Sequence, residues 1–246
     1  MKSPVRNIRA VLFDWDGTLV NSLDVKIRNA GKLFKQVFDL SSQDVQQTYR
    51  RYSGIPRRQL FDAILADLGR PALGDEDYNT LSDRFSTLNT EALSDPSLPG
   101  LIPHATSLVL QSLQEIGCLL FISSSAATEE LQDIASSLGL EKFITGSGGE
   151  IMGSRAGFNK GVHHVDHVCG KYGLTRQELL FVGDDLADIR LGAEAGVLTI
   201  AKAGTYPVDV LFANNADLVV KTLEDITRIP GLVFSAAPGQ GNGISI

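Results

Sequence analysis

The amino-acid sequence predicts an α/β fold in which a doubly wound parallel sheet carries an inserted all-helical segment. Short apolar runs at residues 11–13, 118–122 and 179–182 have the length and composition of buried strands. Helical patterns separate these runs, and this alternation is typical of a parallel sheet that is covered by helices on both faces. Residues 22–97 carry helical patterns alone, so we expect them to form a separate domain.

The expected core consists of residues 1–21 and 98–246, which contain the strand-like runs. Residues 22–97 form the expected helical domain, inserted between the first strand and the second. Residues 230–246 contain several glycines and no periodic pattern, which is typical of a loosely ordered tail. A chain of 246 residues is long enough for two such domains.

Four amphipathic patterns account for the inserted segment. Apolar residues recur at helical spacing over residues 22–38, 45–52, 59–68 and 76–93. Ser41 is of a type that starts helices, and the glycine and proline at residues 54–56 interrupt the pattern. The segment therefore predicts a bundle of helices joined by short loops.

The rest of the chain alternates between strand-like and helical patterns. Further strands are expected at residues 143–145, 197–201 and 217–220. Helices are expected at residues 104–116, 128–139 and 160–172, after Asp188 as far as Gly196, and at 223–229. The glycine-rich residues 146–158 are expected to form a surface loop.

Composition narrows the class of protein. Apolar residues make up 43% of the chain, and a net charge of −7 with a pI near 5.1 argues against a nucleic-acid-binding surface. No apolar run approaches the roughly 18 residues that a membrane-spanning helix needs, and no signal peptide precedes Asp14. Two cysteines cannot form a disulfide framework, so we expect a cytoplasmic protein. The sequence is compatible with a monomer and with a homodimer.

Two carboxylates at alternate positions, Asp14 and Asp16, follow the first strand-like run. Gly17 and Thr18 then turn the chain, and the carboxyl ends of parallel strands are where α/β sheets bind ligands. One carboxylate there can attack an electrophile while the other moves a proton. An Asx turn would use the same residue types, so the pair taken alone leaves both interpretations open.

A second acidic cluster, Asp184, Asp185 and Asp188, follows the run at residues 179–182. A helix cap needs only one such side chain. Carboxylate oxygens are hard ligands that suit Mg²⁺. The cluster therefore predicts a magnesium site in the crevice where the strands end.

Two weaker signals lie between these motifs. Ser123 and Ser124 follow the run at residues 118–122, where a hydroxyl can donate to a phosphate or simply cap the next helix. Lys160 begins a predicted helix, and a lone lysine is usually a solvated surface charge. From the residues alone, both positions keep two interpretations.

The strings FDWDGTLV at residues 13–20 and GDDLAD at residues 183–188 resemble the first and fourth motifs of the haloacid dehalogenase-like (HAD) superfamily of phosphatases. The resemblance covers nearly the whole chain apart from the tail. It implies a Rossmann-like core with a helical cap that closes over the active site. It also implies that Asp14 is a nucleophile, and that Asp16 carries the proton.

The resemblance assigns the remaining site residues more loosely. Ser123 matches the second motif, a hydroxyl residue after a hydrophobic strand. Lys160 matches the lysine of the third motif, with Arg155 as the alternative. We also expect Thr18 and Ser124 to contact the substrate.

The resemblance further implies that Mg²⁺ is the cofactor. Asp14, the backbone carbonyl of Asp16 and Asp184 would hold the ion. Either Asp185 or Asp188 would support it, and the sequence does not distinguish between these two.

The function implied is hydrolysis of a small phosphate monoester, phosphoglycolate-like or a sugar phosphate, through an aspartyl-phosphate. The partner is then a small phosphorylated metabolite. A sugar phosphomutase resembling β-phosphoglucomutase is the alternative, because Arg57 resembles the arginine of that group's cap loop, which grips a distal phosphate. Those mutases have a histidine where this chain has Lys26, which favours the hydrolase. A non-catalytic binding protein on the same fold is a third possibility.

Overall fold

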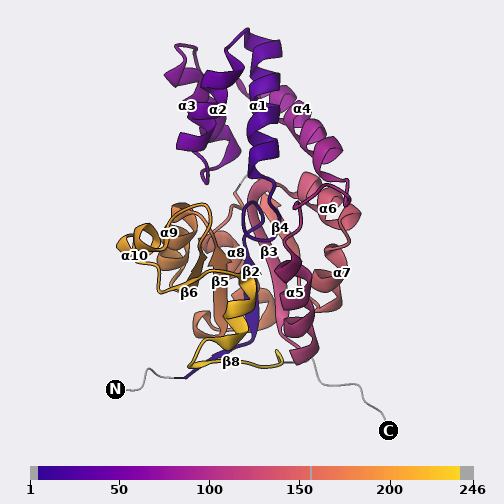
Figure 1. Cartoon of the computed structure of the whole chain (residues 1–246), viewed down its shortest axis with the longest axis vertical. Coiled ribbons are helices and arrows are strands. Elements are labelled where there is room, and N and C mark those ends of the chain that lie inside the picture. Colours follow the sequence, from indigo (N-terminus) through magenta and orange to yellow (C-terminus); the bar gives the residue numbers. More distant parts are fainter. Residues whose placement is uncertain (1–4, 156, 239–246) are drawn as a thin grey trace.

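The computed structural model describes residues 5–155 and 157–238 (Figure 1). Its centre is a six-stranded parallel sheet with the strand order β4-β3-β2-β5-β6-β7. The strands are β2 (Ala10–Phe13), β3 (Leu119–Ala127), β4 (Ile151–Ser154), β5 (Leu179–Gly183), β6 (Leu198–Lys202) and β7 (Leu218–Val220). The predicted fold class, a doubly wound parallel sheet, is confirmed.

Helices cover both faces of the sheet because successive strand residues point to opposite sides. Val11 and Phe13 of β2 join one hydrophobic cluster, whereas Leu12 joins the other. The first face is covered by α5 (His104–Ile116), α6 (Thr128–Ser137), α7 (Glu141–Gly146) and the 3₁₀ helix η2 (Leu223–Arg228). The second is covered by α8 (Val162–Tyr172) and α9 (Leu186–Ala195), with α10 (Val208–Ala213) packed beside α9 and the short η1 (Arg176–Glu178) leading into β5.

The inserted segment forms four helices, which we call the helical unit: α1 (Leu23–Phe38), α2 (Ser42–Arg51), α3 (Arg57–Asp67) and α4 (Asp75–Leu93). They enclose a hydrophobic cluster of their own. Phe61 packs edge-on against Phe34 and Phe85, at ring-centroid distances of 5.2 and 5.4 Å. Figure 1 shows the unit above the strand ends. No helix among the described residues combines the length and apolarity needed to cross a membrane.

The two chain segments that join the helical unit to the sheet are tied together. The backbone N–H of Asn21, which leaves the sheet, donates to the Leu101 carbonyl at 2.8 Å. The Asn21 side-chain amide donates to the Gly100 carbonyl, also at 2.8 Å. The chain therefore enters and leaves the helical unit at neighbouring positions.

Three predicted elements differ from the structure. Residues 143–145 belong to helix α7, where Ile144 packs into the core on one helical face. The predicted glycine-rich loop contains strand β4, which pairs with β3 and brings Gly153 against backbone atoms of Ala126 and Thr128 too closely for any Cβ. The last predicted helix is the tighter 3₁₀ helix η2.

The predicted loose tail is wrong for its first part. Residues Leu232–Phe234 form strand β8, which pairs in parallel with β1 (Arg6–Ile8). Ala237 is buried, and its N–H donates to the Gly117 carbonyl at 3.1 Å. The side chains of Leu232 and Phe234 pack against the hydrophobic cluster on the first face of the sheet. Burial of these apolar side chains favours the ordered conformation of this segment. Residues 239–246 lie outside the described residues.

Candidate active site

A pocket lies between the carboxyl ends of the strands and the helical unit. The core side of its lining comprises Asp14, Asp16, Ser124, Ser125, Ala126, Lys160, Asp184, Asp185, Asp188 and Thr205. The helical unit and its loops contribute Leu23, Lys26, Tyr49, Ser53, Gly54, Ile55, Arg57, Leu60 and Phe85. Charged groups therefore gather at the strand ends, and the opposite wall is a mixture of apolar and basic side chains.

Asp14 lies at the end of β2, where its backbone N–H donates to the Val182 carbonyl at 2.8 Å. Its carboxylate is buried, and Lys160 Nζ lies 2.5 Å from Asp14 Oδ1 and 2.5 Å from Asp188 Oδ1. Burial alone would lower the pKa of Lys160, but the two carboxylates raise it above its ordinary value. Arg155 stacks instead on the Phe158 ring, 4.6 Å from its centroid. The structure thus places Lys160, and not Arg155, beside Asp14.

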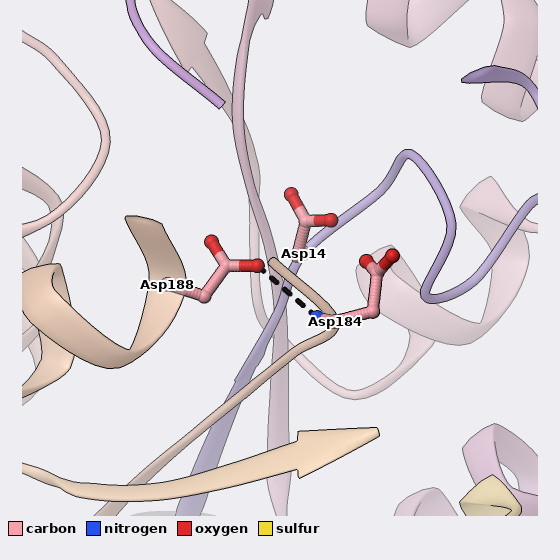
Figure 2. Close-up of side chains that lie close together, drawn as sticks. All are labelled: Asp14, Asp184 and Asp188. Atoms are coloured by element: carbon pink, nitrogen blue, oxygen red, sulfur yellow. Dashed lines mark hydrogen bonds between the residues drawn. The ribbon is translucent and has the colours of Figure 1, made fainter. Parts of the chain in front are cut away.

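Three carboxylates meet in this pocket: Asp14, Asp184 and Asp188 (Figure 2). One carboxylate oxygen from each residue lies within 4.8 Å of those from the other two, and all three residues are buried. Burial raises the pKa of Asp14 well above its ordinary value, and the neighbouring carboxylates raise it further. Burial, followed by the charge of Asp188, raises the pKa of Asp184 to about 6.

This cluster has the donor chemistry of a divalent-cation site. Lys160 can balance only one of the three negative charges, so repulsion among the carboxylates is left over. A hard cation with a preference for oxygen ligands, such as Mg²⁺, fits both the ligand type and the surplus charge. Asp16 and Asp185 lie outside this group of three, although both line the pocket.

Neighbouring residues hold Asp184 in position. The Thr18 hydroxyl donates to Asp184 Oδ1 at 2.7 Å, and the Thr205 hydroxyl donates to Oδ2. A Cβ on Gly17, which has a φ of +85°, would overlap the Asp184 carboxylate, so glycine is needed there. The prediction that Thr18 contacts substrate is wrong for this structure, because the residue is fully buried beneath Asp184.

Asp16 faces the pocket from the turn after β2. Its carboxylate accepts a hydrogen bond from the Ser22 hydroxyl at 2.5 Å and lies 2.7 Å from Lys26 Nζ. Lys26 is a buried residue of α1, so the helical unit supplies a direct partner for this acid. In the sequence, Lys26 was notable only because the mutases have a histidine at this position. The spacing between Asp16 and Lys26 did not predict that the two side chains are in contact.

Of the two serines after the central apolar run, Ser124 faces the pocket as predicted, whereas Ser123 does not. Ser123 is fully buried inside β3, where its hydroxyl lies 2.8 Å from His164 Nδ1. Ser124 lines the pocket, and its hydroxyl accepts a hydrogen bond from the Ala126 N–H at 3.1 Å. The correction follows from strand geometry, since consecutive side chains point to opposite faces.

Asp185 and Asp188, which the sequence could not distinguish, have different surroundings. Asp185 caps the N-terminus of α9 by accepting a hydrogen bond from the Ala187 N–H at 2.8 Å. Asp188 Oδ2 accepts hydrogen bonds from the N–H groups of Asp184 and Asp185, each at 3.1 Å. Of the two, only Asp188 therefore joins Asp14 and Asp184.

Arg57 lies in the pocket wall, as expected of a substrate contact, but its guanidinium already has protein partners. One nitrogen donates to the Ser86 hydroxyl at 2.7 Å, and another forms an ion pair with Glu130 of α6. Glu130 was not predicted, because no motif surrounds it and its partners come from distant parts of the chain.

Comparison with known proteins identifies relatives over most of the chain. The profile of the haloacid dehalogenase-like hydrolase family matches residues 11–202. The phosphoglycolate phosphatase of Pasteurella multocida is 27% identical over 208 residues, which span 82% of this chain and 89% of that protein. The phosphoglycolate phosphatase of Mannheimia succiniciproducens is 25% identical over 222 residues, 88% of this chain and 96% of that protein.

Solved structures share the fold. A predicted phosphoglycolate phosphatase from Haemophilus somnus superposes with a TM-score of 0.74 at 21% identity, over 90% of this chain and 97% of that one. A β-phosphoglucomutase from Clostridium difficile superposes with a TM-score of 0.71 at 16% identity, over 89% and 93% of the two chains. The family match spans the turn after β2, the helical unit and the acidic cluster together, which confirms the resemblance seen in the motifs. The chain belongs to the haloacid dehalogenase-like hydrolase family.

Proposed function

We propose that this enzyme is a Mg²⁺-dependent phosphatase that hydrolyses a small phosphate monoester, phosphoglycolate-like or a sugar phosphate, through an aspartyl-phosphate on Asp14. The observation that carries the proposal is the buried cluster of Asp14, Asp184 and Asp188, with Lys160 between two of its members. The relatives named phosphoglycolate phosphatases support the same reaction class.

In the proposed reaction, a carboxylate oxygen of Asp14 attacks phosphorus while the bond from phosphorus to the alcohol oxygen breaks. Asp16 gives its proton to the departing alkoxide and then takes a proton from the water that hydrolyses the aspartyl-phosphate. Lys160 and Ser124 would hold the oxygens of the phosphoryl group that do not react. Mg²⁺ bound by Asp14, Asp184 and Asp188 would supply positive charge that offsets the charge of the phosphoryl group.

In the proposed reaction, Lys26 would hold the proton carrier Asp16. Its ammonium lies 2.7 Å from the Asp16 carboxylate and comes from the helical unit. We propose that the helical unit acts as the cap, and that it positions the proton carrier when it lies against the core. Exclusion of water by the same contact would keep the proton of Asp16 for the departing alkoxide.

The test uses the full chain and a panel of small phosphorylated acids, sugars and nucleotides, together with p-nitrophenyl phosphate, with and without Mg²⁺. We expect hydrolysis that requires Mg²⁺. Asp14→Asn should lower kcat by at least about 10³-fold, with an unchanged circular dichroism spectrum. Asp24→Asn, at an exposed position paired with Arg50, is the matched control and should retain activity.

Near-normal turnover by Asp14→Asn would contradict the covalent mechanism. Absence of Mg²⁺-dependent hydrolysis over the whole panel would contradict the phosphatase assignment. Adding a bisphosphorylated sugar to a sugar monophosphate, and finding an isomerised product in place of inorganic phosphate, would identify the mutase alternative.

A further inference from the structure

Glu130 is a buried carboxylate that joins the core to the helical unit. It lies in the first turn of α6, and its side chain is 0% exposed. Oε2 pairs with Arg57 and accepts a hydrogen bond from the Ser86 hydroxyl at 2.8 Å. Oε1 accepts a hydrogen bond from the Asn89 amide at 3.0 Å and lies 3.8 Å from Lys26 Nζ. All four partners belong to α1, α3 or α4 of the helical unit.

The surroundings of Glu130 keep it ionised. Burial alone would raise the pKa of Glu130, but the charges of Arg57 and Lys26 and the hydrogen bonds from Arg57 and Ser86 bring it below its ordinary value. A buried carboxylate with this many donors is a fixed negative charge. It lies directly behind the basic wall of the pocket.

Arg57 consequently has little capacity left for a ligand. Its side chain is 9% exposed and lies over the Phe85 ring, 5.1 Å from the centroid. Its guanidinium nitrogens donate to Ser86 and Glu130, and more weakly to the Ser82 hydroxyl at 3.3 Å. A guanidinium whose charge is matched by a neighbouring carboxylate attracts a second anion only weakly.

The position of Arg57 in the pocket determines which part of a substrate it meets. A phosphoryl group held by Asp14, Ser124 and Lys160 would leave the rest of the ester to extend toward the helical unit, where Arg57 lies beside apolar side chains. Among the described residues that line the pocket, the cations Lys26, Arg57 and Lys160 are each paired with at least one carboxylate. The far end of the pocket therefore offers no unmatched positive charge.

We propose that Glu130 is a specificity-determining residue, which neutralises Arg57 and so selects substrates whose leaving alcohol is uncharged. An ester with a hydroxyl-bearing leaving group fits this wall, whereas the charge of a carboxylate or a second phosphate would find no unmatched cation there. Discrimination of this kind leaves the charge of the unwanted ligand without a partner. The inference rests on the proposed function, because it assumes that the phosphoryl group lies at Asp14, and of the two substrate classes proposed there it selects the sugar phosphate over the phosphoglycolate-like acid.

The test compares two esters of similar size, 2-phosphoglycolate and 2-hydroxyethyl phosphate, which differ in the charge of the leaving group. The Mg²⁺-loaded wild-type enzyme should have the higher kcat/KM for 2-hydroxyethyl phosphate. Glu130→Gln should shift the ratio of the two kcat/KM values toward 2-phosphoglycolate by about tenfold. The double variant Glu130→Gln with Arg57→Gln should lose this shift, because the gain depends on the freed guanidinium.

Glu129→Gln is the matched control, since Glu129 is the exposed neighbour of Glu130 on the same helical turn. It makes the same change of charge and should leave the ratio unchanged. A wild-type preference for 2-phosphoglycolate would overturn the proposal, and this measurement needs no variant to fold. A folded Glu130→Gln enzyme with an unaltered ratio would overturn it as well.

Failure of the proposed function can be distinguished from failure of this inference. Wild-type protein that does not hydrolyse p-nitrophenyl phosphate with Mg²⁺ would contradict the phosphatase assignment. Calorimetric dissociation constants of the two esters, measured on Asp14→Asn with and without Glu130→Gln, report the effect of Glu130 without turnover. Equal affinity ratios in these two proteins would refute the role of Glu130.

Discussion

Single residues in the acidic cluster carry a free-energy cost that a bound cation would relieve. Asp184 is held by two threonine hydroxyls and lies against Gly17, yet its pKa is raised to about 6 because burial and the charge of Asp188 both disfavour the ionised form. The folded protein consequently binds this proton more tightly than the unfolded chain, whose carboxyl has an ordinary pKa near 3.8. The metal-free fold therefore loses stability as pH rises from about 3.8 to about 6, and the full cost of the ionised Asp184 is present above about pH 6.

The first prediction concerns this residue. Asp184→Asn should raise the Tm of the protein in EDTA at pH 7.5, and the advantage over wild type should shrink as pH falls below 6, where the wild-type carboxyl takes up its proton. The measurement is thermal unfolding of both proteins from pH 7.5 to 5. His164 acts in the opposite direction, because burial lowers its pKa to about 3, but it is present in both proteins and cancels in the difference.

Addition of Mg²⁺ gives the complementary measurement. A cation that binds the folded state alone raises the Tm, so Mg²⁺ should stabilise wild type more than Asp184→Asn. An equal response of the two proteins to Mg²⁺ would contradict the assignment of Asp184 as a ligand. A lower Tm for Asp184→Asn in EDTA would show that its hydrogen bonds outweigh the charge repulsion.

The sequence predicted the residues of the site that belong to a continuous motif, and it was less informative about the others. Asp14 and Asp184 come from such motifs, and they lie together in the structure. Lys26 and Glu130 belong to no motif, and their roles depend on how the helical unit lies on the core. The sequence assigned the second-motif hydroxyl to Ser123 and not to Ser124. The choice depends on which face of the sheet each side chain points to, and the sequence does not give the position at which the strand loses its regular alternation.

At the scale of elements, the turn between α2 and α3 brings the helical unit into close contact with the N-terminus of α9. Gly54 in this turn has a φ of +87°, and a Cβ there would lie 2.8 Å from Asp185 Oδ1 and 3.0 Å from the Ala187 Cβ. The absence of a side chain at Gly54 therefore lets the helical unit approach the N-terminus of α9. Asp185 caps that helix, whose first turn also contains Asp188.

The second prediction uses this glycine. Gly54→Ala should lower kcat/KM by about tenfold or more, since small displacements near reacting groups have large effects on rate. Gly69→Ala is the matched control, because Gly69 has a similar φ of +71° and no atom within 4 Å of the added Cβ. Both variants should lose about 1 kcal/mol of stability from the backbone strain, so equal loss of activity in the two would contradict the contact argument.

Elements that the sequence predicted correctly have strong periodicity, and the elements it missed depend on tertiary contacts. The four helices of the inserted segment each have an apolar face, and they pack by those faces. Strand β4 has only four residues in a glycine-rich stretch, and it is a strand because β3 offers a free edge for pairing. Residues 143–145 form part of a helix because the helical conformation buries the side chain of Ile144 in the neighbouring hydrophobic core. Short apolar runs fit either structure when taken alone.

At the scale of the whole molecule, the two ends of the described chain close the side of the sheet remote from the pocket. Strand β8 pairs with β1, and the Ser235 N–H donates to the Ile8 carbonyl at 3.0 Å. The Cys118 thiol lies 3.4 Å from the Ser235 carbonyl and is fully buried. Burial raises the pKa of this thiol to about 11, so it is not a reactive thiolate at neutral pH.

The third prediction follows from this closure. A chain that ends at Pro230 should be less stable by at least about 2 kcal/mol, because Leu232 and Phe234 no longer cover the core. The free energy of unfolding from urea titration is the measurement, and a longer chain that ends at residue 238 is the control. Unchanged stability of the shorter chain would mean that β8 contributes nothing, and that the predicted loose tail was right after all.

The hydrogen bonds from Asn21 to Gly100 and Leu101 have a consequence for how this enzyme can change. They hold the two ends of the helical unit next to each other, so the length of the chain between them does not affect the geometry of the sheet. A different set of helices could be grafted between these anchors while the acidic cluster at the strand ends stayed in place. If the proposed function holds, new substrate preferences could arise in a lineage by replacement of the inserted segment alone, without changes to Asp14, Asp184 and Asp188.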